Sequence, residues 1–571
     1  MRKLMMILSV ALTLLVGCSK KADNGQDGQV AAPHLEKRGH ATQLIVNGKP
    51  FLALACELGN STSSSREYMA PHWERLKAAG VNTVLAVVSW EQTEPEEGTF
   101  DFSVVDNLLT DARAHNMKLA LLWFGSWKNG ITSYTPRWVK ADTQRFPWAQ
   151  TPEGKPLPIL TTLGEESCKA DAKAYAALMR HLKEKDAREQ TVVMMQVENE
   201  VGLHGHPRDY CPLAEAAFKG QVPKELTDWL TAHRDSLLPE TLSAWQTGGC
   251  LANGSWEEVF GKNDRAAELF MAWHYAAYME RIVAAGKKEY DLPTFVNAWI
   301  VQPEDTRPGN YPSGGPQAQN HDIWRAAAPH VDILSPDIYL DDFPTILSLY
   351  ARQGNPVFVP ESRSGQNGAA NAAYAIGAMG AIGYSPFGFE RNCDDETNTT
   401  FALFYHQAGK VADRILKAQA EGRIGAAWLK GDNPQRVKDE IRLGDVRIGC
   451  ELVSSGMRNG GAPQLTGGTY DPEAMGYVIA IQEDDAFLFL GSNVRVTFLP
   501  ADGQGYVGLA KVTEGDFDEQ GHWKEGRWLN GDEIQLRYDL LYAVDEGYSG
   551  QGLNFGRPEP VFLKVELFRY E

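Results

Sequence analysis

With 571 residues the chain is long enough for more than one hydrophobic core, and its 43% hydrophobic content excludes wholesale disorder. It carries 55 Lys and Arg against 74 Asp and Glu, which gives a net charge of −19. Because affinity for nucleic acid comes largely from basic side chains that neutralise phosphates, this balance argues against a nucleic-acid partner. Nothing in the sequence indicates the oligomeric state.

The chain begins with a predicted lipoprotein signal peptide over residues 1–18. Arg2 and Lys3 precede an apolar segment, residues 5–16, that is too short for an ordinary membrane helix. The letters LVGC that end at Cys18 resemble the lipobox of bacterial lipoproteins. That resemblance implies lipidation of Cys18, a flexible tether over residues 19–42 and anchoring at the outer membrane or in the periplasm. The alternative is an ordinary cleaved signal with a chance cysteine.

Apolar runs alternate with helical patterns from residue 43 to about 420. The runs are nearly continuous in apolar residues, which suits parallel strands that are buried on both faces. They cover residues 50–58, 81–90, 117–125, 191–200, 292–300, 331–340, 355–362 and 380–390. Helical patterns cover residues 66–80, 103–116, 171–186, 265–289, 343–355 and 368–380.

Eight strands that alternate with helices predict an α/β fold, a (β/α)8 TIM barrel over residues 43–420. A doubly wound open sheet is the structural alternative. Such a sheet more often has a glycine-rich phosphate turn after its first strand, whereas this chain has CELGNSTSSS there.

From residue 421 to 571 short runs alternate between apolar and polar residues, and turn residues separate them. This pattern predicts a C-terminal antiparallel β-sandwich domain.

Six further cysteines contain no close CxxC pair, which argues against a zinc site. Disulfides from Cys168 to Cys211 or from Cys211 to Cys250 are possible, and free buried thiols are equally possible.

Carboxylates and aromatic residues occupy the predicted carboxyl ends of the strands, where barrel enzymes place their chemistry. They include Glu57, Trp90, Glu94, Trp123, Glu200, Asn297, Trp299, Asp337, Tyr339, Glu361 and Glu390. No His/Cys cluster suits a metal, and Ser385 lacks the glycine of a GxSxG elbow. We therefore expect no metal and no cofactor. Paired carboxyl groups beside flat aromatic walls are typical of sugar hydrolysis.

Two stretches carry a family resemblance. VMMQVENEVG, on the fourth strand, resembles the clan-A glycoside hydrolases and most closely the family-35 β-galactosidases, and SWEQTEPEEGTFDF resembles the second strand of that family. The third strand departs from family 35 because it lacks the usual Ala-Glu pair. The letters ESR that begin at Glu361 are more like family 42.

The resemblance implies that Glu200 is the general acid/base, that Glu361 is the nucleophile and that Asn199 binds the sugar 2-OH. Glu390 and Asp337 are the rivals of Glu361. If the strand is regular, Glu198 points the same way as Glu200 and lies deeper, where a salt bridge to a core cation is expected.

Substrate contacts are predicted for Trp90, Glu94, Trp123, Asn297, Trp299 and Tyr339. Packing in the core is the equal alternative for the aromatic residues. Glu94 and also Glu57 either bind sugar hydroxyls or cap the following helix.

The function implied is that of a retaining, exo-acting β-galactosidase on oligosaccharides or polysaccharides, with xyloglucan side chains as one candidate. Its two catalytic carboxyl groups should lie about 5–5.5 Å apart. Another clan-A β-glycosidase, an endo-glycanase and a non-catalytic carbohydrate-binding lipoprotein remain the alternatives.

Overall fold

The computed structural model describes residues 31–453, 470–518, 520–534 and 549–571. The predicted signal peptide, Cys18 and the first part of the predicted tether lie outside the described residues. None of the helices that the structure describes combines the length and the apolar character needed to cross a membrane.

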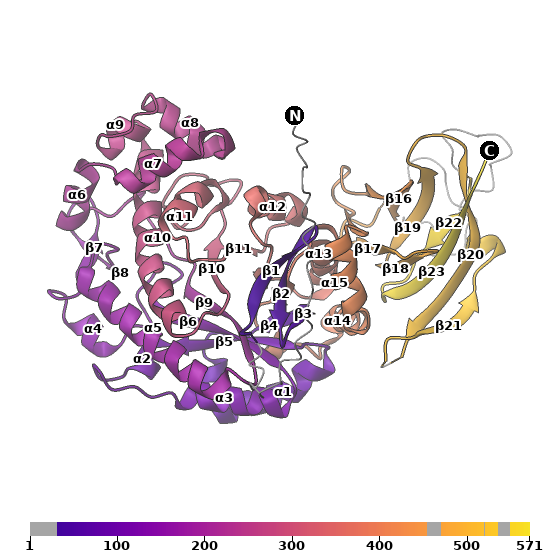
Figure 1. The fold of residues 1–571 in the computed structure, drawn as a ribbon, viewed down its shortest axis with the longest axis horizontal. Coiled ribbons are helices and arrows are strands. Elements are labelled where there is room, and N and C mark those ends of the chain that lie inside the picture. Colours follow the sequence, from indigo (N-terminus) through magenta and orange to yellow (C-terminus); the bar gives the residue numbers. More distant parts are fainter. Residues whose placement is uncertain (1–30, 454–469, 519, 535–548) are drawn as a thin grey trace, which may run out of the picture.

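Eight parallel strands close into a barrel, as the sequence predicts, and each predicted run overlaps one of them (Figure 1). Around the barrel they follow chain order, with the last strand paired to the first. They are β4 (Ala53–Glu57), β5 (Thr83–Ser89), β6 (Lys118–Lys128), β9 (Val192–Asn199), β10 (Thr294–Trp299), β11 (Ile333–Ile338), β12 (Val359–Ser362) and β13 (Gly383–Pro386). Almost every residue in them is buried, which explains their continuous apolar runs.

Helices cover the outside of this barrel. Ser65 caps the first long one by accepting a hydrogen bond from the Tyr68 amide, and Asn263 caps the longest in the same way. They are α1 (Arg66–Ala78), α2 (Trp90–Thr93), α3 (Ser103–Ala114), α4 (Arg137–Ala141), α5 (Glu165–Asp186), α10 (Asp264–Glu289), α11 (His321–Ala327), α12 (Phe343–Tyr350), α13 (Gly365–Ala378), α14 (Thr399–Lys410) and α15 (Ala412–Glu421).

Two additions to the barrel were not predicted. Between β9 and α10 the chain forms four short helices, α6 (Pro212–Lys219), α7 (Lys224–Ala232), α8 (Pro239–Thr247) and α9 (Trp256–Phe260). They lie together beside α10 and α11, at the upper left of the view (Figure 1). Between α4 and α5 lies a small hairpin of β7 (Trp148–Gln150) and β8 (Pro156–Leu160).

The tether prediction does not hold for residues 34–42. They belong to a sheet of β1 (His34–Arg38), β2 (Ala41–Val46) and β3 (Lys49–Phe51). Leu44 and Val46 of β2 join the apolar cluster that fills the barrel, and the buried Gln43 side chain donates to the Leu416 carbonyl over 2.6 Å. The polar composition of β1 is that of a partly exposed strand, not of a flexible segment.

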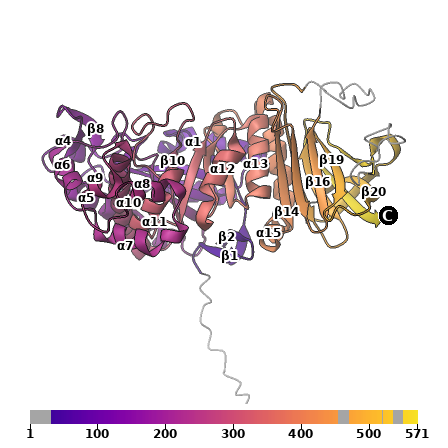
Figure 2. The same cartoon turned by 90° about the horizontal axis from the view of Figure 1, so that it is seen from above.

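Two antiparallel sheets form the C-terminal part, as predicted, and share one apolar core (Figure 2). The six-stranded sheet has the order β14 (Ile424–Lys430), β17 (Met475–Gln482), β18 (Phe487–Ser492), β23 (Val561–Tyr570), β20 (Tyr506–Phe517) and β21 (Trp523–Trp528). The four-stranded sheet has the order β15 (Lys438–Leu443), β16 (Val446–Leu452), β19 (Val494–Pro500) and β22 (Gly552–Asn554).

Helix α13 joins the barrel to the six-stranded sheet by packing on β14 and β17 (Figure 2). Its sequence, GQNGAANAAYAIGA, offers mostly small side chains, which lets the helix approach the sheet closely. The Trp428 indole of β14 donates to the Asn371 side chain over 2.9 Å. The apolar core of the barrel therefore continues into this sheet.

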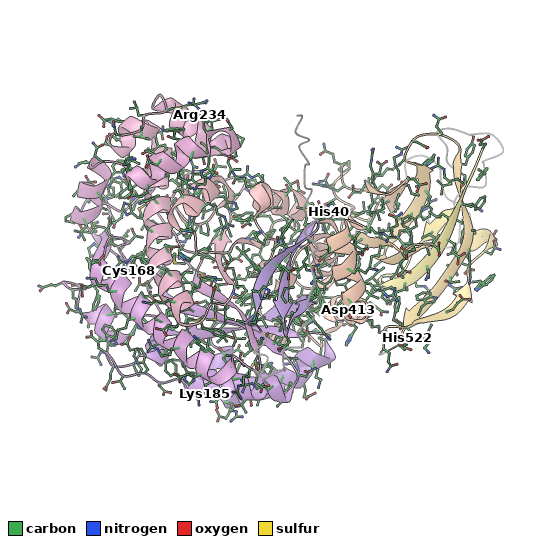
Figure 3. The ribbon with its side chains drawn as sticks, viewed as in Figure 1. His40, Cys168, Lys185, Arg234, Asp413 and His522 are labelled. Carbon is green, nitrogen blue, oxygen red and sulfur yellow. The ribbon has the colours of Figure 1, made fainter. Side chains whose placement is uncertain are left out.

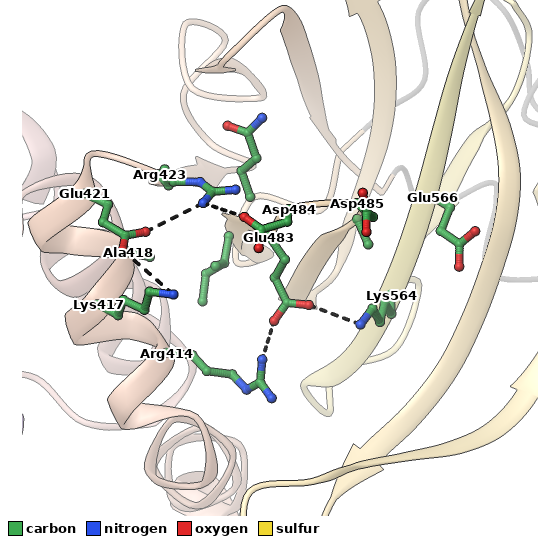
Figure 4. A pocket seen from close by; sticks show the side chains of 13 residues that line it. Arg414, Lys417, Ala418, Glu421, Arg423, Glu483, Asp484, Asp485, Lys564 and Glu566 are labelled. Carbon is green, nitrogen blue, oxygen red and sulfur yellow. Dashed lines mark hydrogen bonds and ion pairs between the residues drawn. The ribbon is translucent and has the colours of Figure 1, made fainter.

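Ion pairs surround the outer side of this junction. A cavity of about 390 Å³ lies between α15 and the β17–β18 turn, and Glu483 there pairs with both Arg414 and Lys564 (Figure 4). The β20–β21 hairpin, which carries His522, reaches back to α14 and α15 near Asp413 (Figure 3).

The described cysteines are all free thiols, and all but Cys250 are buried. The sequence left open whether these cysteines form disulfides or remain free thiols. In the structure they are free thiols, and neither a Cys168–Cys211 nor a Cys211–Cys250 disulfide is present. Cys168 lies on α5 at the outside of the barrel wall (Figure 3).

Candidate active site

Three carboxyl groups meet at the carboxyl ends of the barrel strands. One oxygen from each of Glu200, Asp337 and Glu361 lies within 4.8 Å of the others, and all three residues are buried. Glu200 follows β9, whereas Asp337 and Glu361 are paired residues on the neighbouring strands β11 and β12. Such a group could in principle hold a cation or divide the roles of acid and nucleophile.

Glu390, the other rival for the nucleophile, lies outside this group. Its Oε1 accepts hydrogen bonds from the Gly59 amide and from the Thr62 hydroxyl, both over 2.9 Å. Glu390 therefore stabilises the loop after the first barrel strand.

The electrostatics of the three carboxyl groups favour a retained proton. Burial and then the charge of Glu361 raise the pKa of Glu200 to about 7. Burial and the charges of Glu361 and Glu200 raise the pKa of Asp337 well above its usual range. The cation of Lys128 partly offsets the rise in the pKa of Glu200. Glu200 can therefore carry a proton near neutral pH.

Glu361 is held by two side chains. The Tyr339 hydroxyl donates to its Oε2 over 2.9 Å, and the Asn199 amide donates to its Oε1 over 3.5 Å. Lys128 Nζ in turn donates to Asn199 Oδ1 over 2.8 Å, which fixes the orientation of that amide. The arrangement leaves Glu361 ordered and facing the other two carboxyl groups.

Lys128 was not predicted as a site residue. The predicted third strand ended at Gly125, whereas β6 continues to Lys128. The signal was a lysine directly after the apolar run LALLWFGSW, where a cation is unexpected unless it has a partner.

Asn297, for which substrate contact stays a prediction, connects two members of the cluster. Its Oδ1 accepts the Glu200 amide over 3.1 Å, and its Nδ2 donates to Asp337 Oδ2 over 2.7 Å. Asn297 therefore positions the Glu200 backbone relative to Asp337.

The end of β9 is not a regular strand. Glu198 and Glu200 have positive φ angles of 59° and 45°, in the left-handed region that non-glycine residues rarely adopt. The expectation that they point the same way, with Glu198 paired to a cation, is therefore wrong. Glu198 instead accepts hydrogen bonds from the Ser126 and Trp127 amides, over 2.9 and 2.7 Å.

In the structure the side chains of Trp90, Trp123 and Glu94 are buried and make hydrogen bonds inside the protein. Both tryptophans are fully buried. The Trp90 indole donates to Glu94 Oε2 over 2.9 Å, and the Trp123 indole donates to Asp171 over 2.8 Å. Substrate contact by these three side chains stays a prediction.

Trp299 and Tyr339 are the predicted aromatic residues that remain accessible. Their exposed fractions are 36% and 38%, high for large aromatic side chains at the ends of buried strands. Trp299 also meets the His204 ring edge-on, with 5.4 Å between the ring centroids. These two rings are the available walls for a sugar.

Comparison with known families gives two matches. Residues 60–260 match the model of glycoside hydrolase family 42, described as Beta-galactosidase, and residues 401–540 match a Domain of unknown function (DUF5597). The β-galactosidase LacZ of Heyndrickxia coagulans is 26% identical over 226 residues, which cover 38% of this chain and 31% of that protein. The matched region thus spans about a third of the length of this curated relative.

Solved structures with a similar chain course include two β-galactosidases. The enzyme of Bacillus circulans sp. alkalophilus is 16% identical with a TM-score of 0.43, over 64% of this chain and 57% of that one. The enzyme of Rahnella sp. R3 is 16% identical with a TM-score of 0.42, over 65% of this chain and 57% of that enzyme.

The family match bears on the resemblance seen in the strand motifs. It supports clan A and family 42, to which the ESR letters at Glu361 pointed, and does not support family 35. Over residues 60–260 the chain is therefore similar to the glycoside hydrolases of family 42.

Proposed function

We propose that the protein is a retaining, exo-acting β-galactosidase. The spacing of the carboxyl groups is the observation that carries this proposal. Retaining glycosidases hold their two carboxyl groups about 5–5.5 Å apart, whereas inverting ones need about 6.5–9.5 Å to admit a water. Oxygens of Glu200 and Glu361 within 4.8 Å of each other fit the first class.

In the first step Glu361 attacks the anomeric carbon and Glu200 protonates the departing glycosidic oxygen. The bond from C1 to that oxygen breaks while a bond from C1 to Glu361 forms. The ester has no negative charge, so the repulsion that helps to raise the pKa of Glu200 disappears. Glu200 is then a carboxylate that can take a proton from water as the water attacks C1 and releases Glu361.

The galactosyl preference is supported by the family description and by the strand motifs. Terminal β-galactosyl residues of plant-wall oligosaccharides, such as xyloglucan side chains, are the proposed natural substrate on the strength of resemblance alone.

The test is a panel of 4-nitrophenyl glycosides with the anomeric form of the released sugar followed by NMR. We expect the β-galactoside to be the best substrate and β-galactose to be the first product. Glu361→Ala should lower kcat on the order of 10⁴-fold. First release of α-galactose would contradict retention. Turnover of internal linkages only would favour an endo-glycanase, and no turnover at all would favour a binding protein.

We further propose that the protein is a lipoprotein anchored at Cys18 in the outer membrane or facing the periplasm. The lipobox-like LVGC supports this proposal. Cys18→Ser should move the protein from the membrane fraction to the soluble fraction, because the apolar segment before it is too short to hold it there. Unchanged membrane association would contradict the anchor.

A further inference from the structure

Glu57 stands at the carboxyl end of β4, the first barrel strand, and is completely buried. Neither of its carboxyl oxygens has a hydrogen-bond partner within the part of the chain that the structure describes. A buried polar group without partners costs free energy, so such groups normally bind protein, water or ligand.

The surroundings of Glu57 are those of the catalytic carboxyl groups. Burial raises its pKa well above the usual range, and the charge of Glu361 contributes most after burial. The positive charge of Lys128 lowers the pKa of Glu57, and the negative charge of Glu200 raises it. Glu57 therefore faces the same space as the proposed nucleophile and the proposed acid.

Other buried glutamates at this end of the barrel accept hydrogen bonds within the protein, although Glu390 does so with one oxygen only. Glu94 accepts from the Trp90 indole and the Gly98 amide, and Glu198 accepts from two backbone amides. Glu57 differs because neither of its oxygens accepts a hydrogen bond from a protein donor, although the carboxyl group of Glu361 lies close enough to share a proton with it. Asp337 has one available oxygen too, since Asn297 occupies only its Oδ2.

We propose that Glu57 is a specificity-determining residue that hydrogen-bonds hydroxyl groups of the sugar seated at Glu361. This inference rests on the proposed glycosidase function. Two free oxygens on one carboxyl group can serve two neighbouring hydroxyls. Asn199 donates to Glu361 Oε1 and is the residue proposed for the 2-OH, which leaves hydroxyls farther from the reacting carbon for Glu57.

The charge of this pocket selects an uncharged hexose. Three carboxyl groups, those of Glu200, Asp337 and Glu361, lie together there, and Glu57 stands close to them. Lys128 is the cation that acts on Glu57 and on Glu200, and its ammonium group already donates to Asn199. Among the residues that the structure describes, we expect no other cation to balance a sugar that carries its own carboxylate. The ligand class is therefore a neutral hexopyranose, and uronic acids are excluded.

The experiment measures kcat/KM of Glu57→Leu and Glu57→Gln on aryl β-galactoside and on its 3-, 4- and 6-deoxy analogues. For Glu57→Leu we expect a loss of about 100-fold on the parent substrate, because a polar contact to the hydroxyl disappears. The loss should vanish for at least one deoxy analogue, since that analogue lacks the hydroxyl. Glu57→Gln retains hydrogen-bonding atoms and should lose less than Glu57→Leu. The unmodified enzyme should turn over the β-galacturonide at least 100-fold more slowly than the galactoside.

The outcomes separate the two proposals. If the unmodified enzyme cleaves no glycoside, the proposed function fails. If it cleaves the galactoside while Glu57→Leu loses equally on every analogue, or loses nothing, only the role of Glu57 fails. The thermal midpoint serves as the folding control, because Leu removes an unpartnered buried carboxyl and should not lower it.

Discussion

Glu200 shows how a single position obtains its chemistry from its neighbours. In sequence it is one glutamate of QVENEVG, and the motif alone could assign it a role. The pKa of about 7 depends on burial at the end of β9 and on the charge of Glu361, which lies more than 160 residues later in the chain. The motif therefore suffices to propose Glu200 as the acid, whereas its proton affinity depends on the fold.

Glu200→Gln provides the residue-scale prediction. In the parent enzyme kcat/KM should fall as the pH rises through about 7, because Glu200 then loses the proton that the leaving group needs. The variant has no such proton and should lack this fall. It should also lose far more activity on galactosides with poor leaving groups than on a dinitrophenyl galactoside. If Glu200→Gln lost equal activity on both substrates, or if its kcat/KM still fell as the pH rose through about 7, Glu200 would not be the general acid.

Lys128 and Asn297 mark the limit of sequence reading at this scale. Lys128 matters because its ammonium group contacts Asn199 from another strand, and Asn297 matters because it bridges Glu200 and Asp337. Both are contacts between strands, which a pattern along one strand does not contain.

At the scale of elements, the barrel strands were predictable because both faces of each strand are covered. An apolar run is the direct consequence of that burial. The end of β9 was not predictable, because nothing in QVENEVG indicates a positive φ at Glu198 or Glu200. The four helices after β9 were missed for another reason, since they are short and pack on α10 and α11, outside the repeating pattern of strands and helices.

The ends of β6 and β9 are joined by a buried pair of carboxyl groups. Glu198 accepts the Ser126 and Trp127 amides, and Asp171 accepts the Ser126 hydroxyl and the Trp123 indole. Burial raises the pKa of Glu198 and that of Asp171, and each group lies beside the other. The pair thereby fixes the backbone directly before Asn199 and Glu200.

Gly125→Ala tests whether the Glu198–Asp171 pair positions the end of β9. An added Cβ would lie 2.6 Å from Glu198 Oε1 and 2.8 Å from Asp171 Oδ1, so the carboxyl groups must shift. Because misplacement of a catalytic group by about 1 Å can cost about 10²-fold in rate, we expect kcat/KM to fall about 10- to 100-fold. Gly409→Ala on α14 is the matched control, as its nearest neighbour would lie at 3.6 Å. Equal activity of both variants would show that the pair does not position Glu200.

At the scale of the whole molecule, barrel and sheets are coupled through α13. Residues of the barrel helices and of β14 and β17 belong to one continuous apolar core. The ion pairs around the junction, such as Arg414 with Glu483, are partly exposed. Exposed pairs of this kind usually contribute about 0–1 kcal/mol, so close packing rather than charge should hold the parts together.

Gly377→Val, compared with Arg414→Ala, separates the contribution of packing from that of the ion pairs at the junction. A Cβ at Gly377 would lie 2.7 Å from the Ala426 Cβ and 3.2 Å from Ile479 Cγ1, so the larger side chain should force α13 away from the sheet. Overpacking of this kind typically costs about 1–3 kcal/mol in the free energy of unfolding, whereas Arg414→Ala should cost under about 1 kcal/mol. In scanning calorimetry we expect one transition that moves to lower temperature for Gly377→Val and stays nearly fixed for Arg414→Ala. If the sheets melted in a transition of their own and only that transition moved, the barrel would be stable without them and the continuous core would not be a single cooperative unit.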